Sequence, residues 1–559
     1  MERKSLAIIV VVVIVAAAGI TIPLVMIMFP PAPTAKDHLV FGVMYEMNYL
    51  EPTYAWDSAS IDVIDQIAER LFTFDLSDVA MPIIPALAPG HGTWTADNLV
   101  WTIPIREGVL FHDGTPFNAT AVKWNMDRIM YFTNVTGDLP AAVGLSNTYS
   151  LYVDKINKTE VVDEKTIKIT LNQPFAPFQS LMCFSGAAML SPASTPDKDY
   201  IVTATGDLVG TGPFTYEGYE AGVEVNFLAY EGYWDGASKI KKLTYSVITD
   251  SNARNAALFS GDIDMIDEAL PALVEVINQT KGLKVDGPVG SVITQYLGMN
   301  NLLINRNVRE AISAAFNYDY VIDELRDGKA VRLKSPIPMG IPFANDKFNV
   351  SVFDLTWARM LMCAEYPAET AGLNMSVLET NSDWEDLIAT TPIVTYNYTY
   401  NIGNPTREAI LLVLQDNLAE IGIKIIDAGM TWKAFTDRLD ELEGTHRNMI
   451  DIYFLGWGPD YMDGENYINP LFTNRTIASN GAQYNNPEVQ LWMEEAAVET
   501  DKAKRTVLYD KIQKQIVEVD KPWAFCYVPA LYKCYTEKLH GVLLNPADQM
   551  WFHPCYFEA

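Results

Sequence analysis

The chain has 559 residues, of which 49 % are hydrophobic and 20 % are charged, and both values are usual for globular proteins. This length suits two or three domains, each large enough to bury a core of its own. Lys and Arg number 40 against 70 Asp and Glu, so the formal net charge is −30. Such a charge repels phosphate backbones and anionic lipid surfaces, which argues against nucleic acid as a partner. We attribute most of the acidity to solubility and give attraction of cationic ligands less weight.

Residues 6–29 form an almost wholly apolar run that carries no charge. As a helix, this run is long enough to cross a hydrocarbon core of roughly 30 Å. Arg3 and Lys4 precede it, and because basic residues stay on the cytoplasmic side, the following chain is predicted to lie outside the cell. The run exceeds the roughly 7–15 apolar residues of a signal peptide, which favours an uncleaved membrane anchor over a removable signal. Residues 30–34 are predicted to be a stiff linker, and no cysteine offers a lipidation site there.

The first half of the chain is rich in short strands. Alternating or β-branched runs bounded by turn signals predict strands at residues 38–43, 99–103, 161–171, 223–228 and 243–248. Helices are predicted at residues 61–71 and 251–260. His112 stands beside Asp113, but adjacent side chains diverge and the Asp-Gly-Thr-Pro sequence is a turn signal. A structural turn is therefore favoured over a metal site.

Near residues 287–290 the pattern changes, and helices alternate with strands as in an α/β domain. One stripe of apolar residues at the spacing of a single helical face consists of Val308, Ala311, Ile312, Ala315 and Phe316. A similar stripe covers residues 411–421, and both are interpreted as core. The remaining predicted elements are a strand at 423–426, helices at 487–500 and 503–519, and a strand at 524–529.

The sequence contains little that points to catalysis. Its six histidines are scattered without i, i+4 spacing, and it has no HExxH, GxSxG or GxxxxGK[ST] motif. Carboxylate pairs occur only on polar helix faces, where solvated surface is the better interpretation. No cofactor or metal is therefore expected. The five cysteines form no CxxC pair, and one bridge among Cys526, Cys534 and Cys555 is left open.

Several short motifs follow one another in a specific order. They are WTIPIREGVLFHDGTPFNA at 101–119, GTGPF at 210–214, YWDG at 233–236, LFSGDID at 258–264, Met299-Asn300 with VREAI at 308–312, and LGWGPDY at 455–461. Each is weak alone, but together they resemble the family 5 solute-binding proteins of ATP-driven importers, a group with oligopeptide-, dipeptide- and nickel-binding members. The resemblance covers nearly all of residues 38–557.

This resemblance implies an α/β fold of the periplasmic-binding-protein type II, with two lobes joined by a hinge and a discontinuous first lobe. The expected division is an anchor or signal segment with its linker at 1–35, lobe I at 36–285 plus 500–559, and lobe II at 286–499. Ligand binding is expected to close the hinge, and the closed form would dock on an ABC permease. The ATPase must be a separate chain, because this one has no phosphate-binding loop.

The resemblance also implies a ligand site in the loop at 455–461. By position, Asp460 would pair with the α-ammonium group of a peptide and Trp457 would lie beside the ligand, with Gly456 and Tyr461 in the same loop. A charge-assisted hydrogen bond in a dry cleft is strong, and a buried ammonium group needs a partner. The family commonly continues this loop with an acidic residue and proline, whereas this chain has Asp-Gly-Glu-Asn at 463–466, which is expected to lengthen or soften the turn.

Tyr45, Asn48 and Tyr49 are weaker candidates from the first lobe, and packing beside the first strand is the more probable role for them. The favoured function is capture of di- or oligopeptides outside the cell, by a protein with one N-terminal anchor. The alternatives left open are binding of an oligosaccharide or a metal chelate, a cell-surface hydrolase, and a surface sensor.

Overall fold

The structure is a computed structural model of the chain. It describes residues 36–133, 155–377, 383–443, 446–447, 450–474 and 479–558, together with two short strands near the N-terminus. These strands, β1 (Val12–Val13) and β2 (Leu24–Val25), pair antiparallel. The rest of the anchor predicted at 6–29 lies outside the described residues. Among the helices that the structure describes, none is both long and apolar enough to cross a bilayer.

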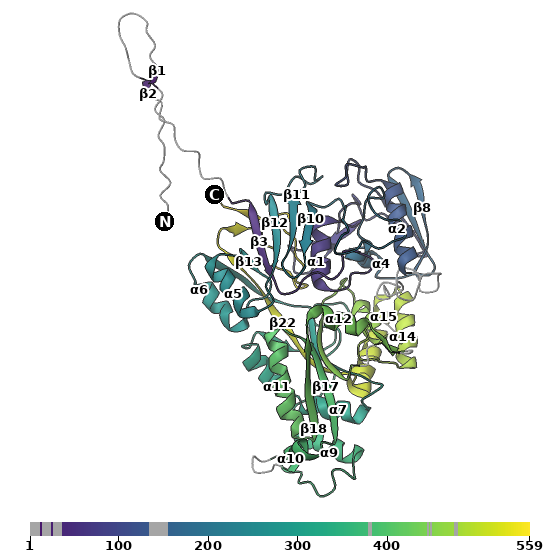
Figure 1. Ribbon diagram of the computed structural model, residues 1–559. Helices are drawn as coiled ribbons and strands as arrows, with labels where there is room; N and C mark the ends of the chain where they lie inside the picture. The colour runs from purple at the N-terminus through teal and green to yellow at the C-terminus, as the bar shows by residue number, and fades with distance from the viewer. Residues whose placement is uncertain are drawn as a thin grey trace, which may run out of the picture.

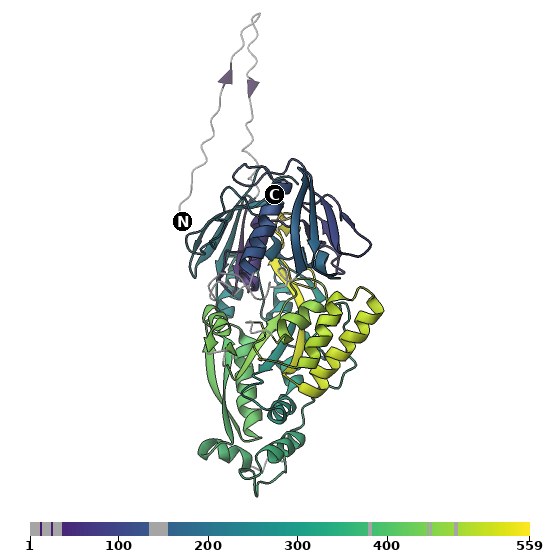
Figure 2. The ribbon, with the colours of Figure 1, turned by 90° about the vertical axis from the view of Figure 1, so that its right-hand side faces the viewer.

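Two lobes lie one above the other in Figure 1. The upper lobe contains the first strands and helices and also the C-terminus, whereas the middle of the chain forms a lower lobe that tapers towards α9 (Leu355–Glu365) and α10 (Asp383–Thr390). Figure 2 shows α14 (Pro487–Val498) and α15 (Lys502–Lys514) in yellow-green on one side of the molecule. The predicted two-lobed α/β fold with a discontinuous first lobe is confirmed.

A sheet of 12 strands extends through both lobes, and ten of the strands follow one path. In order along that path they are β10 (Phe214–Glu220), β11 (Glu224–Ala229), β12 (Lys242–Val247), β3 (His38–Val43), β13 (Met265–Ile266), β22 (Trp523–Thr536), β15 (Thr294–Met299), β21 (Ile452–Trp457), β17 (Val394–Asn401) and β18 (Ile423–Met430). The other two, β14 (Leu283–Gly290) and β16 (Ala330–Arg332), pair with β22.

Strand β22 connects the two lobes. Its second half pairs antiparallel with β13 and β14, while its first half pairs antiparallel with β15 and β16. Strands β14 and β22 therefore cross between the lobes side by side, as a hinge of two strands requires. The strand predicted at 524–529 exists but continues to Thr536, because its second half finds partners in the upper lobe.

The first lobe has a second, smaller sheet, whose strand order is β6 (Thr93–Trp94), β7 (Val100–Pro104), β9 (Thr166–Leu171), β8 (Ile156–Asp163). Helix α2 (Ala119–Thr133) lies between β7 and β8 in the sequence. The single strand predicted at 161–171 is wrong, since β8 and β9 form a hairpin. The chain turns where the Lys165 amide donates to the Asp163 carboxylate at 2.9 Å. Runs of β-branched residues on both sides of that turn concealed it.

Helix α1 (Ser58–Ile67) begins earlier and ends earlier than the predicted 61–71. It begins early because the Asp57 side chain accepts the Ser60 amide at 3.2 Å as an N-cap. It ends at Ile67, whose carbonyl oxygen accepts the Gly212 amide at 2.8 Å. Other short first-lobe elements are β4 (Phe72–Phe74), β5 (Ile83–Pro85), α4 (Phe178–Leu181), α5 (Ser251–Ser260), α6 (Val274–Gln279), β23 (Leu539–His540) and β24 (Tyr556–Phe557).

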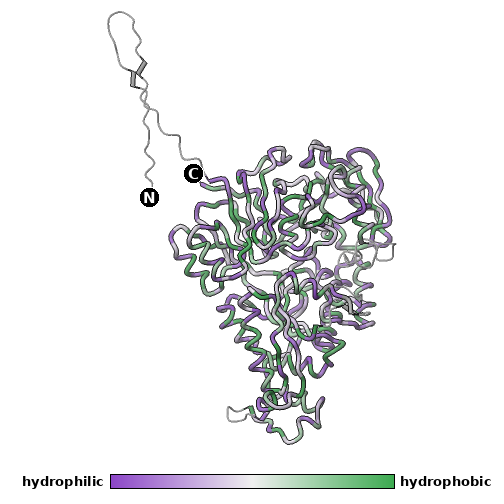
Figure 3. Tube along the Cα trace, in the orientation of Figure 1, coloured by the Kyte–Doolittle hydropathy of each residue, from purple (hydrophilic) through white to green (hydrophobic). Residues whose placement is uncertain are grey.

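Helices flank the sheet of the second lobe. The two apolar stripes are confirmed as core, because Val308, Ala311, Ile312 and Leu414 are fully buried. The helical turns of the tube in Figure 3 carry both hydrophobic and hydrophilic residues. The second-lobe elements not yet given are α7 (Arg306–Ala315), α8 (Tyr318–Tyr320), α11 (Pro405–Ala419), α12 (Trp432–Asp440), β19 (Leu442–Glu443), β20 (His446–Arg447) and α13 (Glu465–Phe472).

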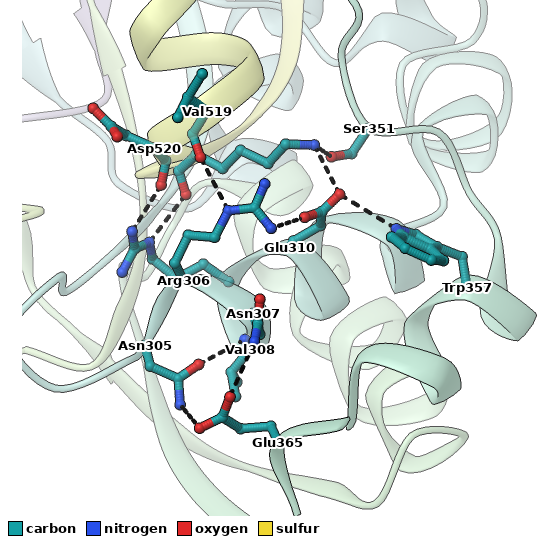
Figure 4. Close-up of polar contacts among 12 residues, drawn as sticks. Asn305, Arg306, Asn307, Val308, Glu310, Ser351, Trp357, Glu365, Val519 and Asp520 are labelled. Atoms are coloured by element: carbon teal, nitrogen blue, oxygen red, sulfur yellow. Dashed lines mark hydrogen bonds and ion pairs between the residues drawn. The ribbon is translucent and has the colours of Figure 1, made fainter. Parts of the chain in front are cut away.

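The chain that enters β22 is fixed to α7 by buried charges. Lys521 has a left-handed backbone, with φ of 48°, and its ammonium group donates to the Glu310 carboxylate at 3.0 Å. The Trp357 indole donates to the same carboxylate, and Arg306 donates to the Val519 carbonyl at 3.0 Å (Figure 4). The hinge strand is therefore held to the second lobe at its first residues.

The predicted lobe boundaries stay a prediction. Helix α15 bears on the boundary predicted at residues 499–500, because it lies directly after it. Its buried residues Tyr509 and Ile512 belong to the same apolar cluster as Tyr296 and Tyr453 of the second-lobe sheet. All five cysteines are free thiols, so the bridge left open near the C-terminus does not form.

Candidate functional site

A cavity of about 260 Å³ lies between the two lobes. Its upper wall comes from the end of β3, helix α1, residues 183–185 and residues 547–549, and its lower wall comes from residues 293–295, Arg407, Trp432 and the loop after β21. A second cavity of about 190 Å³ adjoins it, because Tyr45, Asp267, Ile293, Gln295, Arg407 and Asp548 line both. The two cavities make one cleft at the lobe interface.

Asp460 lies in this cleft at the end of the loop that follows β21. Its side chain is buried, with 7 % exposed. The Asn466 amide group donates to the Asp460 carboxylate at 2.9 Å, and the Asn466 carbonyl oxygen accepts the Asp460 backbone amide at 2.9 Å. The Trp457 indole donates to the same Asn466 oxygen at 3.3 Å. One asparagine in the first turn of α13 therefore positions both predicted ligand-binding side chains.

Burial raises the pKa of Asp460 to about 7, because desolvation disfavours the charged carboxylate. In the described part of the chain, Asp460 forms no ion pair, and its only side-chain hydrogen-bond donor is Asn466. A buried carboxylate of this kind is stabilised when a cation enters beside it. The electrostatics of the loop thus favour a positively charged group in the cleft.

The turn after Asp460 is firmly held, although the sequence was expected to soften it. Arg505 of α15 donates to both oxygens of Asp463, at 3.1 and 2.9 Å. The Glu465 amide also donates to Asp463 at 2.9 Å, which begins α13 directly after the loop. The Asp-Gly-Glu-Asn sequence therefore gives a rigid turn, and it supplies Asn466.

The predicted site residues separate into two groups. Tyr45, Gly456, Trp457 and Asp460 line the main cavity. Asn48, Tyr49 and Tyr461 do not lie among the lining residues. The Asn48 amide group donates to Thr436 across the lobe interface at 3.4 Å, the Tyr49 ring packs edge-on against Tyr54, and Tyr461 is buried in the apolar cluster of the smaller sheet.

Tyr45 connects the lobes at the edge of the cavity. Its ring stacks on Trp432 with 4.9 Å between ring centroids, and its hydroxyl accepts the Asn401 amide at 2.7 Å. A further contact between the lobes joins Arg326 to Glu268 at 2.9 Å. The lobes are therefore in contact around the cavity, as in a closed or nearly closed state.

Sequence reasoning missed several residues of the cleft. Trp432 lies in a helix without any motif, so nothing in the local sequence marked it. Asn466, which holds two residues of the cleft, was noted only as part of the Asp-Gly-Glu-Asn departure at 463–466. The lining carboxylates Asp62 and Asp65 give a weak signal, since acidic residues three apart share one face of an otherwise apolar helix.

Two lobes joined by a two-stranded hinge, with a polar cavity between them, define the class of two-lobed ligand-binding proteins. The model of "Bacterial extracellular solute-binding proteins, family 5 Middle" matches residues 82–479. The chain is 29 % identical to the glutathione-binding protein GsiB of Pectobacterium atrosepticum, over 94 % of this chain and 95 % of that protein. It is 30 % identical to GsiB of Salmonella typhi, over 92 % and 93 % of the two chains.

Solved structures show the same fold at lower sequence identity. The dipeptide-binding protein from Pseudoalteromonas sp. SM9913 in complex with Met-Leu matches with a TM-score of 0.81 at 21 % identity, over 93 % of this chain and all of that one. DppA from Helicobacter pylori in complex with the peptide STSA matches with a TM-score of 0.79 at 23 % identity, over 94 % and 99 % of the two chains. NikA from Staphylococcus aureus in complex with Ni(L-His)2 matches with a TM-score of 0.76 at 19 % identity, over 93 % and all of the two chains.

The chain belongs to the family 5 bacterial extracellular solute-binding proteins. It is the substrate-binding component of an ABC importer, and it is a binding protein and not an enzyme.

Proposed function

We propose that this protein captures di- or oligopeptides outside the cell and delivers them to an ABC permease that a separate ATPase drives. The observation that carries this proposal is Asp460, a buried carboxylate in the cleft with no cationic partner among the described residues. The α-ammonium group of a peptide would form a charge-assisted hydrogen bond with it in a cavity shielded from water. Trp457 would pack beside the first residue of the peptide.

The other end of a peptide has a partner in the cleft as well. Arg407 lines both cavities, and its guanidinium donates to the side chains of Asn401 and Gln295. Because both partners are neutral, they do not compensate the positive charge of Arg407. The Arg407 guanidinium would therefore bind the carboxylate of the peptide. The GsiB relatives are named for glutathione, and two of the structural neighbours hold peptides, which supports a peptide ligand.

Ligand binding would stabilise the closed arrangement, since Tyr45 and Trp432 meet from opposite lobes at the edge of the cavity. We further propose that residues 6–29 hold the protein at the outer face of the membrane or direct its export. Their apolar composition and the preceding basic residues support this.

The test is native mass spectrometry of the purified protein, followed by thermal-shift titration with short peptides and their N-acetylated forms. Free-amine peptides are expected to raise the melting temperature by mass action, and N-acetylated peptides are not. Asp460→Ala should lose the response, whereas Asp416→Asn, a change of an exposed carboxylate on α11, should keep it. Equal responses to free and acetylated peptides would refute the role of Asp460. If a sugar or a metal chelate co-purifies and no peptide binds, the peptide proposal fails.

A further inference from the structure

The cleft carries far more negative than positive charge. The lining of the main cavity includes one cation, Arg407, and a set of carboxylates: Glu46, Asp57, Asp62, Asp65, Asp267, Asp460 and Asp548. The adjoining cavity adds Glu268, Arg326 and Lys329. A high surface charge needs no further explanation in a chain with a net charge of −30. Carboxylates that line a partly enclosed cavity do need one, because partial desolvation makes each charge costly unless a cation compensates it. Asp62 and Asp267 are half-buried in this lining.

Four of the carboxylates on the upper wall already have partners. Asp65 forms an ion pair with Arg70, Asp548 forms one with Lys533, Asp57 accepts the Ser60 hydroxyl at 2.7 Å, and Glu46 accepts the Tyr219 hydroxyl at 2.6 Å. Asp62 and Asp267 differ from them. Among the described residues, neither carboxylate forms an ion pair or accepts a side-chain hydrogen bond. Asp62 and Asp267 are therefore the upper-wall carboxylates that lack a side-chain partner of any kind in the described part of the chain.

Tyr245 provides a second and independent indication of a ligand at the same place. Its side chain lines the cavity, is 3 % exposed, and its hydroxyl finds no hydrogen-bond partner in the part of the chain that the structure describes. A buried hydroxyl without a partner costs free energy, so such groups are normally satisfied. Asp62, Asp267 and Tyr245 line the same cavity, and both carboxylates act electrostatically on the tyrosine hydroxyl.

The charges around these side chains support a cation as the missing partner. Burial, together with the charges of Asp267 and Asp65, raises the pKa of Asp62 well above its usual range. Burial and Asp548 raise the pKa of Asp267 to about 6, even though Arg254 and Lys533 act in the opposite direction. Arg254 is occupied by the Ile248 carbonyl at 2.6 Å, and Lys533 by Asp548. The existing cations therefore do not neutralise this pair.

The missing cation is better explained as an organic one than as a metal ion. Across the described residues, no three histidine, cysteine or carboxylate side chains come close enough together to hold a metal ion. Two carboxylates and a hydroxyl suit an ammonium or guanidinium group, which needs several acceptors around its donors.

Building on the peptide-binding function proposed above, we propose that Asp62, Asp267 and Tyr245 form a second cation subsite, which selects peptides that carry a Lys or Arg side chain. The two carboxylates accept hydrogen bonds from the basic side chain, and the tyrosine hydroxyl oxygen accepts another. Asp460 belongs to the lower wall of the cleft, whereas this subsite belongs to the upper wall. A peptide with two positive charges therefore binds both lobes at once and favours their closure.

The experiment compares tetra-alanine with peptides in which one residue, at position two, three or four, is Lys, Gln or Nε-acetyl-Lys. Dissociation constants are measured by titration calorimetry with the full chain at pH 8. At one of the positions, Lys is expected to bind at least about tenfold more tightly than Gln or acetyl-Lys, as a charge-assisted hydrogen bond allows. The comparison with acetyl-Lys uses only the wild type, so it does not depend on any variant folding.

Asp62→Asn and Asp267→Asn are expected to reduce the preference for Lys over Gln to about onefold to threefold, because each removes a charge that attracts the ammonium group. Asp416→Asn is the matched control and should keep the full preference. If Lys and Gln peptides bind the wild type equally at all positions, the subsite is refuted while the peptide function stands. If tetra-alanine and all its derivatives fail to bind, the peptide function fails and the subsite fails with it.

Discussion

At the scale of single residues, Asp460 is the group whose protonation should control capture. Its pKa in the empty cleft is raised to about 7 by burial, and an ammonium group binds the ionised form. The affinity for free-amine peptides should therefore fall as the pH drops from about 8 to about 5, by up to about tenfold for each pH unit below the pKa. Calorimetry in buffers of different ionisation enthalpy should also detect proton release on binding near pH 6.

Asp460→Asn serves as the reference for this experiment, because an amide cannot titrate in that range. For peptides without basic side chains, its residual affinity should change much less between pH 5 and 8 than that of the wild type, because the remaining titrating carboxylates, Asp62 and Asp267, lie on the opposite wall of the cleft. A wild-type affinity that does not change with pH would mean that Asp460 does not contact the ligand's ammonium group.

Asn466 should matter as much as the residues that it holds. Removing its side chain takes from the Asp460 carboxylate the only side-chain donor that the described residues supply, and it frees the Trp457 indole. Asn466→Ala should therefore weaken binding of free-amine peptides by about tenfold, as expected for loss of positioning at a charged contact. Asn469→Ala, in the same helix, changes a contact to Glu465 and should leave the affinity close to that of the wild type. Similar affinities for the two variants would contradict this role for Asn466.

At the scale of elements, the loop with the GTGPF motif at residues 210–214 lies close to the end of α1, and this close approach explains the first glycine of the motif. Gly210 packs so closely that an added Cβ would lie 2.2 Å from the Ile67 carbonyl oxygen, which is backbone and cannot move away easily. Gly210→Ala should therefore destabilise the protein by roughly 1–3 kcal/mol, as overpacking does. Chemical denaturation would measure this, with Gly90→Ala as the control because its Cβ would meet nothing within 4 Å. An unchanged midpoint for Gly210→Ala would show that the loop moves freely.

Elements with a strong local pattern could be predicted from the sequence. The helix at 251–260 and the strand at 38–43 have the predicted bounds, since local residues determine both. Asp250 and Gly261 cap the two ends of the helix, and the strand carries its own alternation. The hairpin at β8 and β9 could not be predicted, because its turn carries neither Gly nor Pro. The length of β22 could not be predicted either, because strand partners from the other lobe determine it.

At the scale of the whole molecule, buried carboxylates should make the unliganded protein more stable at mildly acidic pH. Burial raises the pKa of Glu69 and of Asp460 to about 7 and that of Asp267 to about 6. Between these values and the unfolded pKa near 4, the folded state binds protons that the unfolded chain does not bind, so the free energy of unfolding increases as the pH falls from about 8 to about 5. Denaturant titrations at several pH values should show this, with a smaller slope for Asp460→Asn than for Asp416→Asn. A stability that rises with pH over this range would contradict the burial of these groups.

The candidate site could be predicted only where one short segment carries it. The loop with Trp457 and Asp460 was identified from its motif, and both residues line the cavity. Asp62 and Asp267 are about two hundred residues apart in the chain, and only the pairing of β3 with β12 and β13 brings their segments together. Long-range pairing of this kind leaves no local trace in the sequence.

Strand β22 has a consequence for the biosynthesis of the chain. It lies between β13 and β15 in the middle of the large sheet, yet it comes from residues 523–536 of 559. Until those residues have left the ribosome, neither lobe can complete its sheet, and strands on both sides keep unpaired edges that invite aggregation. A nascent chain stopped before residue 523 is therefore not a smaller domain but an incomplete pair of lobes, which depends on chaperones or on late completion to stay soluble.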